Sequence, residues 1–112
     1  MKNFDFIESY NEVQKECHNI TKSKGFWDGE NHNVAEKIAL IHSEISEGLE
    51  SYRNGDSPDD KLPHYSGLTV ELADAIIRIM DLSEYLILPV ADAICEKMEF
   101  NSKRPHKHGK SF

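Results

Sequence analysis

Four carboxylates in two matched pairs are the residues of this sequence whose types and spacing could do chemistry. Glu44 and Glu47 are three residues apart, and Glu71 and Asp74 repeat that interval further along the chain. Residues three apart share one face of a helix, so each pair would point its carboxylates in one direction. Like charges on a helix cost about 0.2–0.5 kcal/mol per pair, and more beside an apolar core, where screening is weak. Because Mg²⁺ and Mn²⁺ prefer carboxylate oxygens, the spacing predicts a metal-binding site formed by the two pairs.

A simpler interpretation of the same residues stays open. Glutamate is common on helices, and the two pairs could form an exposed acidic face that has Arg78 and Lys37 as its counter-ions. In that case the carboxylates would bind no metal.

The charge of the chain is unevenly distributed. The 112 residues carry a formal net charge of -7, yet residues 101–112 hold four basic side chains and no acidic one. Subtracting that +4 from -7 leaves the body, residues 1–100, at -11. Such a body repels nucleic acid and attracts cations, whereas the basic tail would attract phosphate. Nucleic acid is therefore not an expected partner.

Composition also argues against a membrane or secreted protein. The sequence contains no run of about 18 apolar residues, and its first residues lack the apolar stretch of a signal peptide. Cys17 and Cys95 lie far apart and neither belongs to a C-x-x-C pair, which argues against a disulfide framework or a zinc site. We expect a cytoplasmic protein with two reduced thiols and no membrane partner.

The elements that must position the carboxylates are predicted to be helices throughout. Apolar residues recur at intervals of three and four, as in the run Ile38, Ile41, Ile45 and Leu49. No convincing strand, repeat or glycine-rich phosphate loop is present. The expected fold is an all-α, four-helix bundle-like single domain spanning 1–112, with a basic tail at 101–112. The expected helices cover about 4–22, 33–53, 68–86 and 89–100.

Local signals mark where these helices begin. Asn3 and Asn33 are candidate N-caps, and either Ser66 or Thr69 could cap the third helix. Pro89 suits the first turn of the fourth helix, in which Met98 is expected to face inward. The third helix is apolar nearly all round, which predicts the centre of the bundle or a subunit interface.

Three blocks of the sequence resemble the MazG-like nucleoside triphosphate pyrophosphohydrolases. Residues 36–53 look like the second helix of that family, and residues 71–81, which begin Glu-Leu-Ala-Asp, look like the third. The family pattern is E-x-x-E followed, after a gap of one to three dozen residues, by E-x-x-D; here the gap is 48–70. Residues 96–110 resemble the C-terminus of short members, so that the resemblance covers about 27–110.

The resemblance implies a magnesium-dependent enzyme that cleaves a nucleoside triphosphate, NTP or dNTP, to the monophosphate and pyrophosphate in nucleotide pool control. The implied metal ligands are Glu44, Glu47, Glu71 and Asp74, with Mg²⁺ as the ion and Mn²⁺ as its alternative. Glu44 and Glu47 are the expected catalytic residues, and we expect Glu47 to accept the proton of the attacking water. Family members assemble as dimers or tetramers, so a homodimer or homotetramer is expected.

The resemblance also implies where the substrate is held. Lys97, Asn101 and Arg104 match family positions that approach the phosphates, and Lys110 is a weaker candidate for the same role. Trp27 lies in the loop before the second helix, where an aromatic ring could stack on a base. Asn33 could contact the nucleotide there, although its role as a helix cap is the favoured one.

Other functions remain open at this point. The chain could be a non-enzymatic helical interaction module, which would show no metal-dependent activity. It could be a nucleic-acid-binding protein that uses its basic tail, although the charge of the body opposes this. It could also be a phosphohydrolase of a modified or signalling nucleotide. Release of pyrophosphate would support the pyrophosphohydrolase, whereas release of orthophosphate would not.

Overall fold

The computed structural model describes residues 3–112, and this part of the chain is all-helical, as predicted. No strand forms within it, and none of its helices is long and apolar enough to cross a membrane. The elements are α1 (Phe4–Ser23), α2 (Val34–Arg53), α3 (Gly67–Leu86), α4 (Val90–Ser102) and a short 3₁₀ turn, η1 (His106–Gly109).

Local capping determines where the first three helices start. The side chains of Asn3, Asn33 and Ser66 each accept a hydrogen bond from the backbone N–H three residues on, at 3.0, 3.1 and 3.1 Å. These bonds satisfy N–H groups that have no partner inside the helix. They confirm the caps predicted at Asn3 and Asn33 and select Ser66 over Thr69. Pro89 is the N-cap residue of α4 and not, as predicted, part of its first turn.

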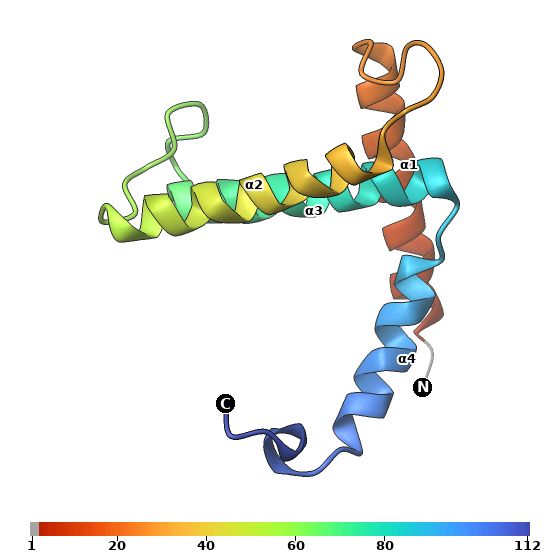
Figure 1. Cartoon of the computed structure of the whole chain (residues 1–112), viewed down its shortest axis with the longest axis vertical. Helices are drawn as coiled ribbons and strands as arrows, with labels where there is room; N and C mark the ends of the chain where they lie inside the picture. The colour runs from red at the N-terminus through yellow and green to blue at the C-terminus, as the bar shows by residue number, and fades with distance from the viewer. Residues whose placement is uncertain (1–2) are drawn as a thin grey trace.

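The helices form two arms that meet at α1 (Figure 1). In one arm α2 and α3 lie side by side and antiparallel, joined by the loop 54–66 at its outer end. α1 crosses this pair where α2 begins and α3 ends, and it packs against α3. α4 turns away from the pair and packs along α1 in the second arm. The four helices therefore make an open arrangement.

The core of this open arrangement is small, because each helix has few neighbours. Met98 was expected to face inward, but it is 67% exposed, since the packed side of α4 is the one that carries Ala91 and Cys95. On α2 the apolar run remains largely uncovered, with Ile45 exposed to 49%. The buried apolar residues are Ala75, Met80, Leu82, Ala91 and Cys95.

Candidate functional site

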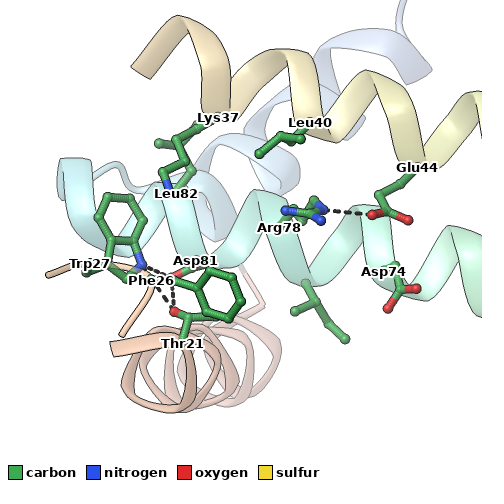
Figure 2. Close-up of a pocket in the computed structure, with 11 residues that line it drawn as sticks. Thr21, Phe26, Trp27, Lys37, Leu40, Glu44, Asp74, Arg78, Asp81 and Leu82 are labelled. Atoms are coloured by element: carbon green, nitrogen blue, oxygen red, sulfur yellow. Dashed lines mark hydrogen bonds and ion pairs between the residues drawn. The ribbon is translucent and has the colours of Figure 1, made fainter. Parts of the chain in front are cut away.

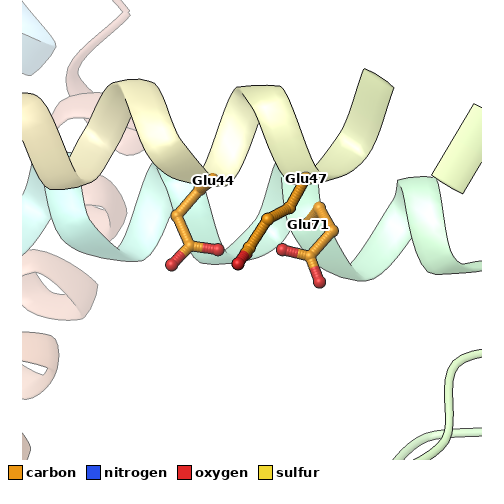
Figure 3. Close-up of side chains that lie close together, drawn as sticks. All are labelled: Glu44, Glu47 and Glu71. Carbon is orange, nitrogen blue, oxygen red and sulfur yellow. The ribbon is translucent and has the colours of Figure 1, made fainter. Parts of the chain in front are cut away.

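Glu44 and Glu47 of α2 and Glu71 of α3 gather at the middle of the α2–α3 pair (Figure 3). One carboxylate oxygen from each residue lies within 4.8 Å of the corresponding oxygens of the other two. We call these three residues the acid cluster. Their proximity follows from the antiparallel packing of α2 and α3, which places Glu71 opposite Glu44 and Glu47.

Gly48 is the residue that lets the two helices approach so closely at the acid cluster. It is buried in the middle of α2, beside Glu47. A Cβ atom at this position would lie 3.2 Å from Leu68 Cδ1 and 3.5 Å from Glu71 Cβ. The absence of a side chain therefore leaves room for the side chains of Leu68 and Glu71 of α3.

Burial and mutual repulsion change the protonation of the acid cluster. Burial raises the pKa of Glu71 to about 8, and the hydrogen bonds and charges of Glu44 and Glu47 act in the same direction. At neutral pH Glu71 therefore holds a proton, which it shares with the neighbouring carboxylates. The pKa of Glu44 moves the other way: burial raises it, but the hydrogen bonds from Arg78 and Glu71 outweigh burial and lower it.

Arg78 supports the acid cluster from α3. Its Nε donates a hydrogen bond to Glu44 Oε1 at 2.8 Å, and Glu44 is only 8% exposed (Figure 2). The charge of a buried carboxylate is tolerated when it is paired in this way. Lys37, the other expected counter-ion, instead places its Nζ 4.4 Å from the centre of the Trp27 ring.

Asp74, the fourth predicted metal ligand, lies beside the acid cluster but is not one of its members. Its side chain lines a pocket together with Glu44 and Arg78 (Figure 2). Burial raises its pKa, and the negative charge of Glu44 adds to the effect. The structure thus brings three of the four predicted ligands into one cluster and places Asp74 on its pocket side.

The acid cluster offers a donor set suited to a hard divalent cation. It presents three carboxylates from two rigid helices, and Glu71 Oε2 is buried without a hydrogen-bond partner in the described residues. Mg²⁺ and Mn²⁺ take oxygen ligands of this kind and retain waters at their remaining positions. These residues would therefore fit such an ion, although Arg78 and the shared proton also stabilise the cluster without one.

The adjoining pocket has a volume of about 370 Å³ and runs along α3 between α2 and the loop after α1 (Figure 2). Its carboxylate end is formed by Glu44 and Asp74. Its opposite, aromatic end is formed by Thr21, Phe26 and Trp27. Apolar side chains of α2 and α3 line the pocket as well: Leu40, Ile77 and Leu82. No sequence pattern pointed to Thr21, because only the crossing of α1 over α3 brings it here.

Trp27 and Asn33, the predicted base contacts, are both engaged within the protein. The Trp27 ring stacks on Tyr85 with a centroid distance of 4.4 Å and an interplanar angle of 20°. Its Nε1 donates to Asp81 Oδ1 at 2.9 Å. The Asn33 side chain caps α2, in agreement with the favoured interpretation of this residue.

The four predicted phosphate-binding residues lie on the second arm of the molecule, away from the acid cluster. Lys97 and Asn101 line a groove on α4, and the Oδ1 atom of Asn101 is buried without a partner in the described residues. Lys97 Nζ and Arg104 Cζ lie 4.7 and 5.6 Å from the centre of the Phe100 ring. Lys110 follows η1, near the C-terminus (Figure 1). A single chain therefore does not bring these residues to the carboxylates.

Comparison of the chain with family models, curated proteins and solved structures finds no match. The MazG-like resemblance of the sequence stays a prediction, and the geometry of the site is described from this chain alone.

Proposed function

We propose that the protein is a magnesium-dependent nucleoside triphosphate pyrophosphohydrolase. The observation that carries the proposal is the acid cluster, a three-carboxylate donor set that opens beside a pocket of about 370 Å³. A nucleoside triphosphate has a strongly anionic end, which carboxylates alone would repel, and a less polar nucleoside end. A site with a cation-binding end and an apolar pocket suits both parts of such a molecule.

In this proposal the residues of the acid cluster hold the ion and prepare the attacking water. Bound Mg²⁺ supplies neutralisation of the phosphate charge and lowers the pKa of a water. Arg78 keeps Glu44 in place through its hydrogen bond of 2.8 Å. Glu47 accepts a proton from the water as the water oxygen bonds to phosphorus. The bridge between the α- and β-phosphates then breaks, which releases the monophosphate and pyrophosphate.

A product assay tests this reaction. The protein is incubated with each of the eight common nucleoside triphosphates, with Mg²⁺ or with chelator, and pyrophosphate and orthophosphate are measured separately. We expect pyrophosphate only when the metal is present.

Glu47→Gln should lower turnover by roughly 100-fold or more, the usual contribution of a general base. Glu50→Gln, an exposed change one turn further along α2, is the matched control and should retain activity. Unchanged turnover in Glu47→Gln would refute the proposed base.

The proposed enzyme is a homodimer or homotetramer. Ile38, Ile45 and Leu49 of α2 and Leu72 and Ile76 of α3 are exposed in the single chain, and a second copy would cover them. The same assembly would allow the basic tail of one copy to approach the acid cluster of another, which matches the opposite charges of body and tail. Light scattering at micromolar concentration should show a particle larger than the 12.8 kDa of one chain.

A mixing experiment tests whether the tail acts on another copy. Glu47→Gln and Arg104→Ala should each be inactive alone. In a mixed dimer, one site combines an intact acid cluster from one chain with an intact tail from the other, so activity should return. If mixing restores nothing although the two chains exchange, the tail of one copy does not serve the site of another.

A helical interaction module is the second candidate function. It is favoured by the pairing of Arg78 with Glu44, since this pairing stabilises the acid cluster without a metal. Under this alternative, no nucleotide is hydrolysed in the product assay and replacement of the carboxylates leaves assembly intact.

A further inference from the structure

The pocket beside the acid cluster has one end lined by carboxylates and another lined by aromatic rings. The aromatic end could hold an uncharged part of a ligand, which the carboxylates would not bind. Glu44, Asp74 and Arg78 lie at the carboxylate end, and Phe26 lies at the aromatic end (Figure 2). The inference developed here rests on the proposed function, because it concerns the part of a nucleotide that is remote from its phosphates.

Trp27 lines the pocket, but its ring already makes several contacts within the protein. Tyr85 stacks on it at 4.4 Å, and the rings of His18 and His32 meet it edge-on with centroids at 5.2 and 5.0 Å. Lys37 Nζ lies over the same ring, 4.4 Å from its centre. Trp27 is half-buried, and its contacts with Tyr85, His18, His32 and Lys37 connect the loop to the neighbouring helices.

Phe26, the residue before Trp27, is in the opposite situation. It lines the pocket and is 66% exposed, and no aromatic ring of the described residues stacks on it. An exposed phenyl ring beside a cavity is a suitable platform for a planar heterocycle, because stacking removes one face of each ring from water. Its backbone is held, since Phe26 N–H donates to Thr21 O at 3.1 Å.

Asp81 fixes the segment that carries Phe26. Its Oδ1 accepts hydrogen bonds from Thr21 Oγ1 at 2.7 Å and from Trp27 Nε1 at 2.9 Å, and it contacts His18 Nδ1 at 2.7 Å. One carboxylate oxygen of α3 thereby ties down α1 and the loop that follows it. A hydrogen bond to a charged acceptor is stronger than a neutral one, so this anchor restricts the loop.

We infer that Phe26 is the platform on which the base of the nucleotide stacks and that Asp81 is a positioning residue that holds this platform through Trp27 and Thr21. The base would lie at the aromatic end of the pocket while the phosphates lie at the carboxylate end. The recognition is therefore by stacking on a ring, and it requires no contact between Trp27 and the base.

Equilibrium binding separates this inference from the proposed reaction. Calorimetry with Ca²⁺ in place of Mg²⁺ compares the nucleoside triphosphates with methyl triphosphate, which has the same phosphates but no base. The wild type should bind its best nucleotide at least roughly tenfold more tightly than methyl triphosphate, in keeping with the usual strength of base stacking. Phe26→Ala should lose this preference, Phe26→Trp should retain it, and Phe4→Ala, an exposed phenylalanine outside the pocket, should leave it unchanged.

Two results would overturn the inference: a wild type without the preference, or a Phe26→Ala variant that keeps it. If the preference exists but no pyrophosphate forms in the product assay, the platform is supported and the proposed reaction fails. Trp27 is the sole tryptophan of the chain, so its fluorescence should respond to the nucleotide and not to methyl triphosphate.

The role of Asp81 is tested with Asp81→Asn and, as a milder change, Thr21→Val, which removes one of the donors. Both should reduce the preference for nucleotide over methyl triphosphate and leave the affinity for methyl triphosphate unaltered. If the folded variants lose thermal stability but keep the wild-type preference, Asp81 is structural only and the inference about it is wrong.

Discussion

Glu71 is the residue whose protonation most affects the acid cluster. Burial and the neighbouring carboxylates raise its pKa to about 8, so at neutral pH it acts as a hydrogen-bond donor within the cluster. Loss of that proton would leave three carboxylates, of which Glu44 is the one paired with Arg78. A bound cation and the proton therefore compete for the same oxygens.

The pKa of Glu71 predicts how stability depends on pH in protein freed of metal. Its folded pKa of about 8 lies above the ordinary value of 4.5, so the folded state binds more protons between these limits. The stabilisation from this proton is complete below the ordinary pKa and is lost as pH rises through about 8. The free energy of unfolding, measured with urea and chelator, should thus decrease from about pH 5.5 to about pH 8.5.

Glu71→Gln supplies the comparison for this prediction. Glutamine keeps the hydrogen-bonding shape but does not titrate, so the pH dependence should become flatter in the variant. Glu50→Gln should behave like the wild type, because Glu50 is exposed and lies outside the acid cluster. Equal pH dependence in the wild type and Glu71→Gln would show that Glu71 does not carry the proton.

At the scale of the elements, the contact between α2 and α3 decides whether the carboxylates meet. Small residues let helices pack closely, and beside the acid cluster the small residue of α2 is Gly48. At the N-terminus of α3 a second glycine, Gly67, faces Ser51 of α2 with no room for a Cβ atom. Two positions without side chains therefore allow close contact between the two helices at Ser51 and at Glu71.

Gly48→Leu should separate α2 from α3 and disrupt the acid cluster. Because even a Cβ atom would lie 3.2 Å from Leu68, a whole leucine side chain overpacks the contact and should destabilise the protein by about 1–3 kcal/mol. Metal binding by calorimetry should weaken as well. Ser46→Leu adds the same bulk at an exposed position of α2 and should change stability by less than about 0.5 kcal/mol. Retention of full metal binding in a folded Gly48→Leu protein would contradict this account of the contact.

At the scale of the whole molecule, the two arms leave much apolar surface uncovered. Exposed apolar side chains recur along α2 and α3, and few apolar side chains of the described residues are buried. A monomer with so small a core would be marginal, since folding must offset a large loss of chain entropy. Assembly would bury these faces and close the space between the arms that Figure 1 shows.

Ile45→Glu tests whether the exposed face of α2 is the contact between copies. Ile45 is 49% exposed, so the change should be tolerated in the monomer, while a charge in a covered interface is costly. We expect light scattering to show a shift from the assembled form to the 12.8 kDa chain. Ser43→Glu adds a charge to the opposite face of α2 and should leave assembly intact. An unaltered particle size in folded Ile45→Glu would place the interface elsewhere.

Local features of the sequence determined the elements of this protein. The helix starts at Asn3 and Asn33 were predictable, and that of the third helix was narrowed to Ser66 or Thr69, because a cap acts through neighbouring residues and needs nothing from the rest of the chain. The spacing of the carboxylates likewise placed each pair on one helical face. The confirmed all-α fold and the gathering of Glu44, Glu47 and Glu71 follow from these short-range rules together with antiparallel packing.

Only the tertiary structure decided what each helix face contacts. Periodicity finds an apolar stripe but does not say whether a neighbour covers it, so Met98 is exposed while the polar Gln14 is buried. The same holds for the pocket: the different roles of Phe26 and Trp27 depend on Tyr85 and Asp81, which lie more than fifty residues away in the sequence. Contacts between distant segments depend on how the helices cross, and no local pattern of residues encodes that geometry.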